Sequence, residues 1–182
     1  MATIAIVGDG PGGLSAALFL AKAGQTVTVF GTDETAMHYA YLHNYLGIPE
    51  ISGSDFQRVA RGQVTAFGAE LRPGRVAQAT PGDGQLTLTT EDGIEVSVDY
   101  LILTEGKNPA LAESLGLEKT EDGITVDREY RSSMDRVYVV GRSARPSRSQ
   151  AIISAGAGAI AAVDILSRET GTDYQDWDSP PD

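Results

Sequence analysis

The first residues that could do chemistry form a glycine-rich run near the start of the chain. Gly8-Asp-Gly-Pro-Gly-Gly13 fits the pattern G-x-G-x-x-G, with Gly8, Gly10 and Gly13 at its fixed places. There the first glycine permits a tight turn, the second lets the backbone approach a pyrophosphate, and the third lets a helix pack closely on a strand. The pattern predicts a dinucleotide-binding site, with a tight turn that binds nothing as the alternative.

An acid at the end of the second strand usually accompanies such a loop and bonds a ribose hydroxyl. Gly31 occupies that position here, directly after Val27-Thr-Val-Phe30. Asp33 or Glu34 could reach the ribose from the following loop, or both could be ordinary solvated acids. Of the two, we predict Asp33 as the residue that bonds the ribose.

Other chemistry is sparse. The chain contains no cysteine and only two histidines, His38 and His43, so we expect no disulfide, no cysteine nucleophile and no metal site. No Ser-His-Asp order or Walker loop is present, and no catalytic residue is assigned. His43 is the one candidate proton donor. It lies in a long irregular stretch, residues 31–53, whose tyrosines either face a ligand or, as we expect, pack the loop onto the core.

The elements that must position the glycine run open the chain as a βαβ unit. Thr3–Val7 and Thr26–Phe30 are apolar and rich in β-branched residues, and a helical pattern over Leu14–Lys22 separates them. Further strands are expected at 70–77, 86–90, 94–98, 99–103, 124–126 and 137–140, and helices at 56–67, 109–115 and 150–168. We therefore predict a Rossmann-like α/β fold of three layers, with a central parallel sheet and a small β-meander over residues 84–98. Residues 1–170 would form a single domain and residues 171–182 an acidic, disordered tail.

Composition limits the partners. The 182 residues carry a net charge of −11, which disfavours nucleic acids and anionic membranes. Lysine supplies only three of the 14 basic residues, and this acid-rich, lysine-poor balance favours a salt-adapted protein over an ordinary acidic one. The apolar start is short and runs straight into glycines, and no apolar run approaches the ~20 residues of a membrane span. We expect a cytoplasmic protein.

Several motifs in order resemble the FAD domain of thioredoxin reductase and its pyridine nucleotide–disulfide oxidoreductase relatives. Ile6 to Ala17 is similar to the first motif of that family, and His43-Asn-Tyr-Leu-Gly-Ile-Pro49 to its Glu-Asn-Phe-Pro-Gly-Phe-Pro segment. Val137-Tyr-Val-Val-Gly141 and the segment Ser149 to Ala162 follow its closing pattern. The resemblance reaches Ser167 and implies the same fold.

The departures from the family are as informative as the matches. The family inserts a whole NADPH-binding domain, with a Cys-x-x-Cys pair, after its Ala-Thr-Gly strand. Here Leu103-Thr-Glu-Gly106 runs directly into Lys107-Asn-Pro109, and the chain has no cysteine. The resemblance therefore implies a flavin domain without dithiol chemistry, and not a thioredoxin reductase.

The resemblance implies FAD as cofactor and assigns its site. Asn44 matches the asparagine on the flavin side, Val76 a position beside the adenine, and Gln150 with Ala151 the start of the final helix beside flavin N1 and O2. The family's Gly-Asp has become Gly141-Arg142, where the arginine either contacts a phosphate directly or points away from a site that has lost its flavin. The residues assigned to the pyrophosphate are Gly8, Gly10, Pro11, Gly12 and Gly13.

Two functions of different classes remain open. The first is a minimal flavoprotein, an oxidoreductase or electron carrier, reduced by a separate electron-donor protein or by free NAD(P)H. Homodimerisation is expected with it, because relatives pair through this domain. The second is a non-catalytic nucleotide- or partner-binding module, favoured by the missing acids at Gly31 and Arg142. NAD or NADP at the same loop is a weaker third reading, since the final helix resembles that of FAD proteins.

Overall fold

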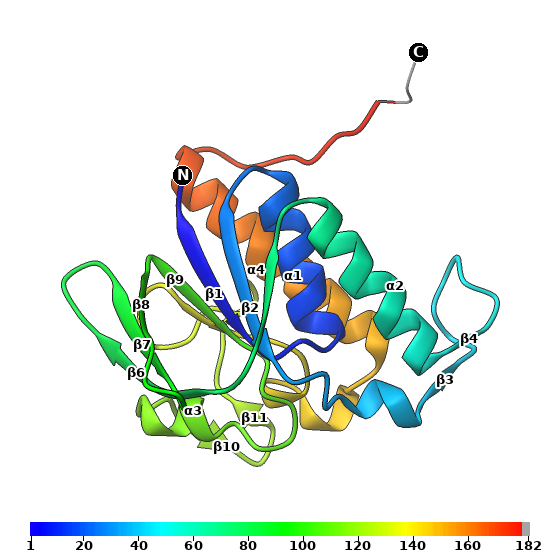
Figure 1. The fold of residues 1–182 in the computed structure, drawn as a ribbon, viewed down its shortest axis with the longest axis horizontal. Coiled ribbons are helices and arrows are strands. Elements are labelled where there is room, and N and C mark those ends of the chain that lie inside the picture. The colour runs from blue at the N-terminus through cyan, green and yellow to red at the C-terminus, as the bar shows by residue number, and fades with distance from the viewer. Residues whose placement is uncertain (180–182) are drawn as a thin grey trace.

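The computed structural model describes residues 1–179 as three stacked layers (Figure 1). The middle layer is a five-stranded parallel sheet with the strand order β12-β9-β1-β2-β5. Its strands are β1 (Thr3–Val7), β2 (Thr26–Gly31), β5 (Glu70–Pro73), β9 (Tyr100–Leu103) and β12 (Val137–Val139). This confirms the predicted α/β class with a central parallel sheet.

The sheet is buried on both faces, which explains its continuous apolar strands. Ile4 pairs in register with Val27 on one side and Tyr100 on the other. Along β9 the side chains alternate, so that Tyr100 and Ile102 enter the core on the helical face while Leu101 and Leu103 enter the core on the opposite face.

Three helices cover one face of the sheet: α1 (Pro11–Lys22), α2 (Gly53–Ala66) and α4 (Ala151–Thr170) (Figure 1). α1 and α4 pack closely because small residues meet at their crossing. A Cβ on Gly158 would overlap the carbonyl oxygen of Gly12, so glycine is required there. The buried alanines of both helices, such as Ala16 and Ala161, complete this close contact.

The other face carries an antiparallel meander of β6 (Val76–Pro81), β7 (Leu86–Thr90) and β8 (Glu95–Val98). It is longer than the meander predicted over residues 84–98, because β6 adds a strand before it. Leu86, Leu88 and Val98 point from it into the second core, where the short helix α3 (Ala110–Ser114) also packs. The remaining elements are short: η1 (Ala36–Tyr39), β3 (Tyr41–Leu42), β4 (Ile51–Ser52), β10 (Lys119–Thr120), β11 (Gly123–Ile124), η2 (Gly141–Ser143) and η3 (Pro146–Arg148).

Several element boundaries differ from the sequence prediction, and two of these differences have a clear physical cause. The strand expected over residues 70–77 is two strands in different sheets, because Pro73 lacks an N–H for the ladder and Gly74, at a φ of +134°, turns the chain. The helix expected from Phe56 starts at Gly53, since the Ser52 hydroxyl accepts a hydrogen bond from the Asp55 N–H at 3.1 Å and caps it.

Helix α4 is the longest helix within residues 1–179. Within residues 1–179 it alone is long and apolar enough to cross a membrane, so the expectation that no run approaches that length was wrong for this segment. Its Gly158 packs against α1, and its Asp164 pairs with Arg131, as in a core helix.

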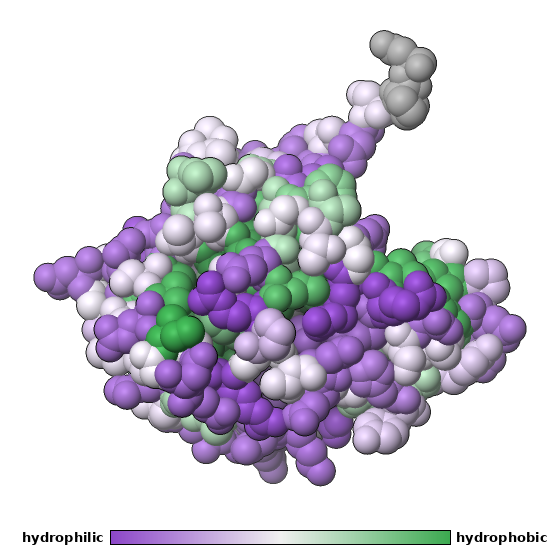
Figure 2. All heavy atoms as spheres, viewed as in Figure 1, coloured by the Kyte–Doolittle hydropathy of each residue, from purple (hydrophilic) through white to green (hydrophobic). Residues whose placement is uncertain are grey.

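Hydrophilic residues cover most of the face seen in Figure 2, in keeping with the acidic composition.

The segment after α4 runs across the outside of the molecule without helix or strand up to residue 179. Lys22 Nζ donates to Asp176 and Asp178 at 2.8 and 2.6 Å, and Tyr174 packs against the core. Trp177 is 84% exposed. The disordered tail predicted over residues 171–182 stays a prediction, and residues 180–182 lie outside the described residues.

Candidate functional site

The glycine-rich run forms the turn between β1 and α1. Gly8 has a φ of +109°, and a Cβ on it would overlap the carbonyl oxygen of Thr104, the residue after β9. A Cβ on Gly13 would overlap the carbonyl oxygen of Gly8. A Cβ on Gly10 would meet only Thr35 Oγ1, at 3.5 Å. Packing therefore requires Gly8 and Gly13, whereas Gly10 leaves its backbone open to a ligand.

This turn lies at the switch point of the sheet, where β2 and β5 extend to one side of β1 while β9 and β12 extend to the other (Figure 1). Ligands of open parallel sheets bind at such a point, outside the carboxyl ends of the strands. A cavity of about 840 Å³ opens there, lined by Val7, Gly31 and Thr104 among others, and we call it the central cavity. Its volume falls within the range of roughly 300–1,000 Å³ that ligand sites occupy.

Most of the residues that the sequence assigned to the cofactor line the central cavity, and four do not. Gly13 is buried at the contact of α1 with β1, while Asp33, Asn44 and Gln150 lie outside the lining. The assigned residues that line it are Gly8, Gly10, Pro11, Gly12, Val76, Gly141, Arg142 and Ala151.

Two long helices point uncapped N-termini at the central cavity. α1 follows Gly10 and α4 follows Gln150, and neither has a side-chain cap or an acidic residue in its first turn. α2, which starts away from the cavity, has both, in Ser52 and Asp55. Free N–H groups and the positive end of the helix dipole attract anions. The two uncapped ends therefore suit the cavity to an anionic ligand.

Arg142 adds a positive charge to the same wall. It follows Gly141 at the end of β12, lines the cavity and is only partly exposed. Its Nε atom is buried and has no hydrogen-bond partner among residues 1–179. A buried guanidinium N–H without a partner is costly, so this atom fits a ligand that supplies an acceptor.

At the end of β2, the candidate ribose acid Asp33 lies outside the lining of the central cavity. Its carboxylate lies 3.3 Å from His38 Nε2, and its N–H donates to Asp9 Oδ2 at 2.9 Å. Glu34 lines the cavity but pairs with Arg75 at 2.5 Å. Asp9 itself, inside the glycine run, lines the cavity and is 6% exposed. The sequence analysis did not single out Asp9, although an acid within a phosphate-binding loop is itself a signal.

Asn44 and Gln150, assigned to the flavin side from separate motifs, come together in space. Asn44 Nδ2 donates a hydrogen bond to Gln150 Oε1 at 3.0 Å, which joins the loop before β4 to the start of α4. Both residues are exposed. Ser149 and Ala151, on either side of Gln150, line the cavity, so the pair lies at its rim.

The segment after β9 supplies cavity residues that the sequence analysis missed. Thr104, Glu105, Lys107 and Asn108 all line the wall. Burial raises the pKa of Glu105, against hydrogen bonds from the backbone N–H groups of Leu111 and Ala112 at 2.7 and 3.1 Å that lower it. Their position directly after β9 could have identified them, because the residues that follow the strands of a parallel sheet all lie at the same edge of the sheet.

The tyrosines of residues 31–53 do not pack onto the core as expected. Tyr39 is 94% and Tyr41 57% exposed, while Tyr45 packs against Phe56 in a tilted arrangement, with ring centroids 5.2 Å apart. His43 lies in the open, 3.9 Å from Glu50. Within residues 1–179, no three acidic or histidine side chains form a metal-binding group.

Comparison with known proteins identifies the family. The family model described as pyridine nucleotide-disulphide oxidoreductase matches residues 45–159. The chain belongs to this family. The thioredoxin reductase of Peptoclostridium acidaminophilum is 29% identical over 147 residues, which cover 76% of this chain and 46% of that protein. The dihydrolipoyl dehydrogenase of Halobacterium salinarum is 27% identical and aligns with 95% of this chain and 36% of its own length.

Solved structures of the family share the fold. The atypical thioredoxin reductase from Desulfovibrio vulgaris Hildenborough superposes with a TM-score of 0.84 at 19% identity, covering 94% of this chain and 99% of that chain. A thioredoxin reductase from Gloeobacter violaceus gives 0.82 at 18% identity, covering 97% and 99%. The family match and the shared fold together bear out the resemblance to a thioredoxin-reductase-like FAD domain.

Family membership implies the cofactor but does not show the particular activity of this chain. The chain spans between a third and a half of the length of the curated relatives it matches. The family is one of flavoprotein oxidoreductases, which implies FAD. The family's dithiol is absent from this sequence, which has no cysteine.

Proposed function

We propose that this chain is a minimal FAD-binding flavoprotein that carries electrons without dithiol chemistry. One observation carries the proposal: two uncapped helix N-termini and the open backbone at Gly10 meet in one cavity large enough for a dinucleotide. The orphaned Nε of Arg142 in the same cavity fits an anionic ligand. Membership of a flavoprotein family supports FAD as that ligand.

The residues present would hold FAD along the length of the central cavity. Gly10, Pro11 and Gly12, with the N-terminus of α1, would bind the pyrophosphate, and Val76 would lie beside the adenine. Arg142 would donate to a phosphate oxygen, since guanidinium–phosphate hydrogen bonds are strong. Asn44 would approach the flavin side from the rim, where it bonds Gln150.

The protein's contribution is binding, orientation and electrostatics. When bound, FAD supplies the capacity to accept and donate electrons. The free N–H groups at the start of α4 would stabilise negative charge on the flavin, because its first turn holds no acid to oppose them. No residue of the chain is assigned a catalytic role.

The proposal includes partners. A separate electron-donor protein or free NAD(P)H would reduce the flavin, because Gly106 after β9 runs directly into Lys107, with no nucleotide domain inserted between them. A second copy would pair with the first. The exposed isoleucines of α4, Ile152, Ile153 and Ile160, support such pairing by offering apolar surface outside the core.

The absorption spectrum of the purified protein in concentrated salt, before and after adding FAD, tests this function. We expect flavin bands that co-purify, or that appear on addition of FAD and survive desalting. Turnover with NADH and an artificial acceptor would then separate an enzyme from a flavin carrier.

A colourless protein that does not retain FAD would contradict the proposal. The replacement of the usual acids by Gly31 and Arg142 would then favour the second candidate function, a non-catalytic nucleotide- or partner-binding module. Binding of ADP by that colourless protein would support the module.

A further inference from the structure

The space beside Gly31, where a ribose-binding acid would start, is already filled by a carboxylate. A Cβ on Gly31 would lie 2.7 Å from both carboxylate oxygens of Asp9. Asp9 belongs to the glycine run at the end of β1, and β1 and β2 are neighbours in the sheet. The side chain from the first strand therefore occupies the place that a side chain at the end of the second strand would take.

We propose that Asp9 supplies the carboxylate that binds the ribose hydroxyls in the AMP half of the dinucleotide. This rests on the proposed function. In dinucleotide folds that carboxylate comes from the end of the second strand. Here the acid has moved to the phosphate-binding loop, and the glycine at position 31 makes room for it.

The two oxygens of Asp9 have different surroundings. Oδ2 accepts hydrogen bonds from Arg61 Nη1 at 2.5 Å and from the Asp33 N–H at 2.9 Å. Oδ1 accepts none from residues 1–179. Since Asp9 lines the central cavity, Oδ1 is the acceptor available to a ligand hydroxyl. The bonds to Oδ2 fix the orientation in which Oδ1 is offered.

An acid inside an anion-binding loop would repel the pyrophosphate unless its charge were compensated. Arg61 provides that compensation by pairing with Asp9, with 26% of the arginine side chain exposed. Gln57, one turn earlier on α2 and 1% exposed, donates from Nε2 to the Asp9 carbonyl oxygen at 2.5 Å. One face of α2 thus holds both the backbone and the side chain of Asp9 while keeping the local charge balanced.

The other two acids near the end of β2 do not compete for this role. Glu34 is paired with Arg75, and both side chains are at least 60% exposed. The Asp33 carboxylate faces His38. Glu34 is the matched control, because it lines the same cavity and its substitution removes the same charge.

This assignment has a consequence for specificity. A carboxylate accepts hydrogen bonds from free ribose hydroxyls and repels a phosphate esterified at the same position. The chain should therefore select adenine nucleotides with free ribose hydroxyls and reject those with a 2′-phosphate.

The test measures the dissociation constants of ADP and 2′-deoxy-ADP, by calorimetry or by displacement of bound FAD. We expect the intact chain to bind ADP about tenfold more tightly than 2′-deoxy-ADP, because a hydrogen bond to a charged group usually changes affinity by about this factor. Asp9→Ser should abolish this ratio, and Glu34→Gln should leave it unchanged. Asp9→Ala combined with Gly31→Glu, which returns the acid to β2, should restore it.

The ratio separates a ribose contact from a merely structural role. A defect in the fold would weaken both nucleotides together and leave their ratio intact, so an unchanged ratio in Asp9→Ser overturns the inference. Equal affinities for the two nucleotides in a chain that does bind FAD would also overturn it, with the proposed function still standing. A chain that binds neither FAD nor ADP would contradict the proposed function itself.

Discussion

At the scale of single residues, Arg142 allows a direct test of how the central cavity recognises charge. Its Nε has no partner within the described part of the chain, and no acid pairs with its guanidinium there. If Arg142 donates to a phosphate, Arg142→Ala should weaken FAD binding by roughly ten- to a hundredfold, because hydrogen bonds to charged groups contribute about 1.5–3 kcal/mol. Fluorescence titration of FAD measures this.

Arg148 supplies the matched control for that measurement. It lies six residues further along, is exposed, and does not line the cavity. Arg148→Ala removes the same charge from the same region, so it reports the long-range electrostatic effect alone. Equal losses in the two variants would show that Arg142 acts by general attraction and makes no specific contact.

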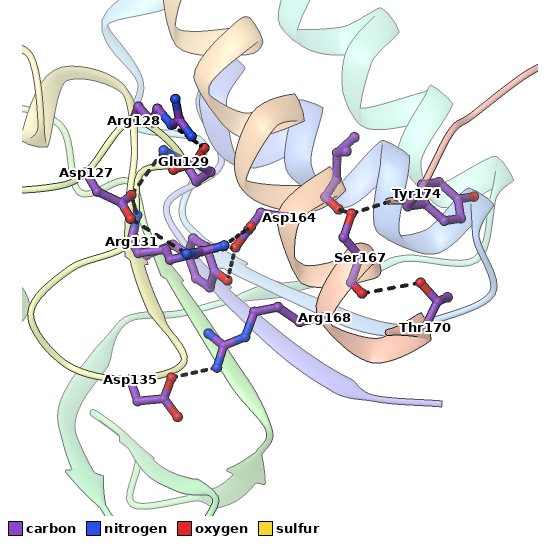
Figure 3. Close-up of polar contacts among 12 residues, drawn as sticks. Asp127, Arg128, Glu129, Arg131, Asp135, Asp164, Ser167, Arg168, Thr170 and Tyr174 are labelled. Atoms are coloured by element: carbon purple, nitrogen blue, oxygen red, sulfur yellow. Dashed lines mark hydrogen bonds and ion pairs between the residues drawn. The ribbon is translucent and has the colours of Figure 1, made fainter. Parts of the chain in front are cut away.

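At the scale of elements, a polar cluster ties α4 to β12 and the loop before it (Figure 3). Asp164 on α4 accepts from Arg131 Nε at 2.8 Å and from the Tyr138 hydroxyl at 2.6 Å. Arg168, one turn further along α4, donates to Asp135 at 2.6 Å. The contacts lie in the C-terminal half of the helix, so they fix how α4 lies on the sheet while its N-terminus borders the cavity.

Asp164 should contribute stability that depends on pH. Burial alone would raise its pKa, but hydrogen bonds from Arg131 and Tyr138 outweigh burial and hold the pKa below the ordinary value of 3.8. A lowered pKa stabilises the fold fully above the ordinary value, and the contribution is lost as pH falls through the folded-state value. Asp164→Asn should lower the free energy of unfolding by about 1–3 kcal/mol at neutral pH. The difference from the parent should shrink below about pH 4.

Urea unfolding at several pH values measures this difference. Asp135→Asn is the control, because Asp135 also pairs with an arginine of the cluster but is 71% exposed, so its loss should stay within about 0.5 kcal/mol. Equal losses for the two variants would mean that the buried position of Asp164 is unimportant.

Local patterns predicted the elements that rest on local physics. The βαβ unit could be predicted because its apolar strands and the G-x-G-x-x-G turn lie close together in the sequence. Local patterns do not show which sheet a strand joins. Residues 70–77 therefore look like one strand in the sequence, although they contribute to two different sheets in the structure. The role of Asp9 depends on Gly31 and on Arg61 of α2, which only the folded chain brings together. Asn44 and Gln150 were found by resemblance, and no local rule joins them.

At the scale of the whole molecule, the net charge of −11 sets two effects of salt against each other. Screening weakens the exposed ion pairs, such as Arg58–Asp55 and Arg75–Glu34, but solvent-exposed pairs contribute little to stability. Screening also relieves repulsion among all the unpaired acids, and the Debye length falls from about 30 Å at 0.01 M to about 3 Å at 1 M salt. We expect repulsion to dominate, so that 1 M KCl stabilises the fold by on the order of 2 kcal/mol, or roughly 4–8 °C in Tm. Calorimetry at matched ionic strength in chloride and in nitrate separates screening, which is the same for both salts, from ion-specific effects. A Tm that falls with salt would mean that the ion pairs outweigh the repulsion, and it would remove the physical basis for reading this composition as salt-adapted.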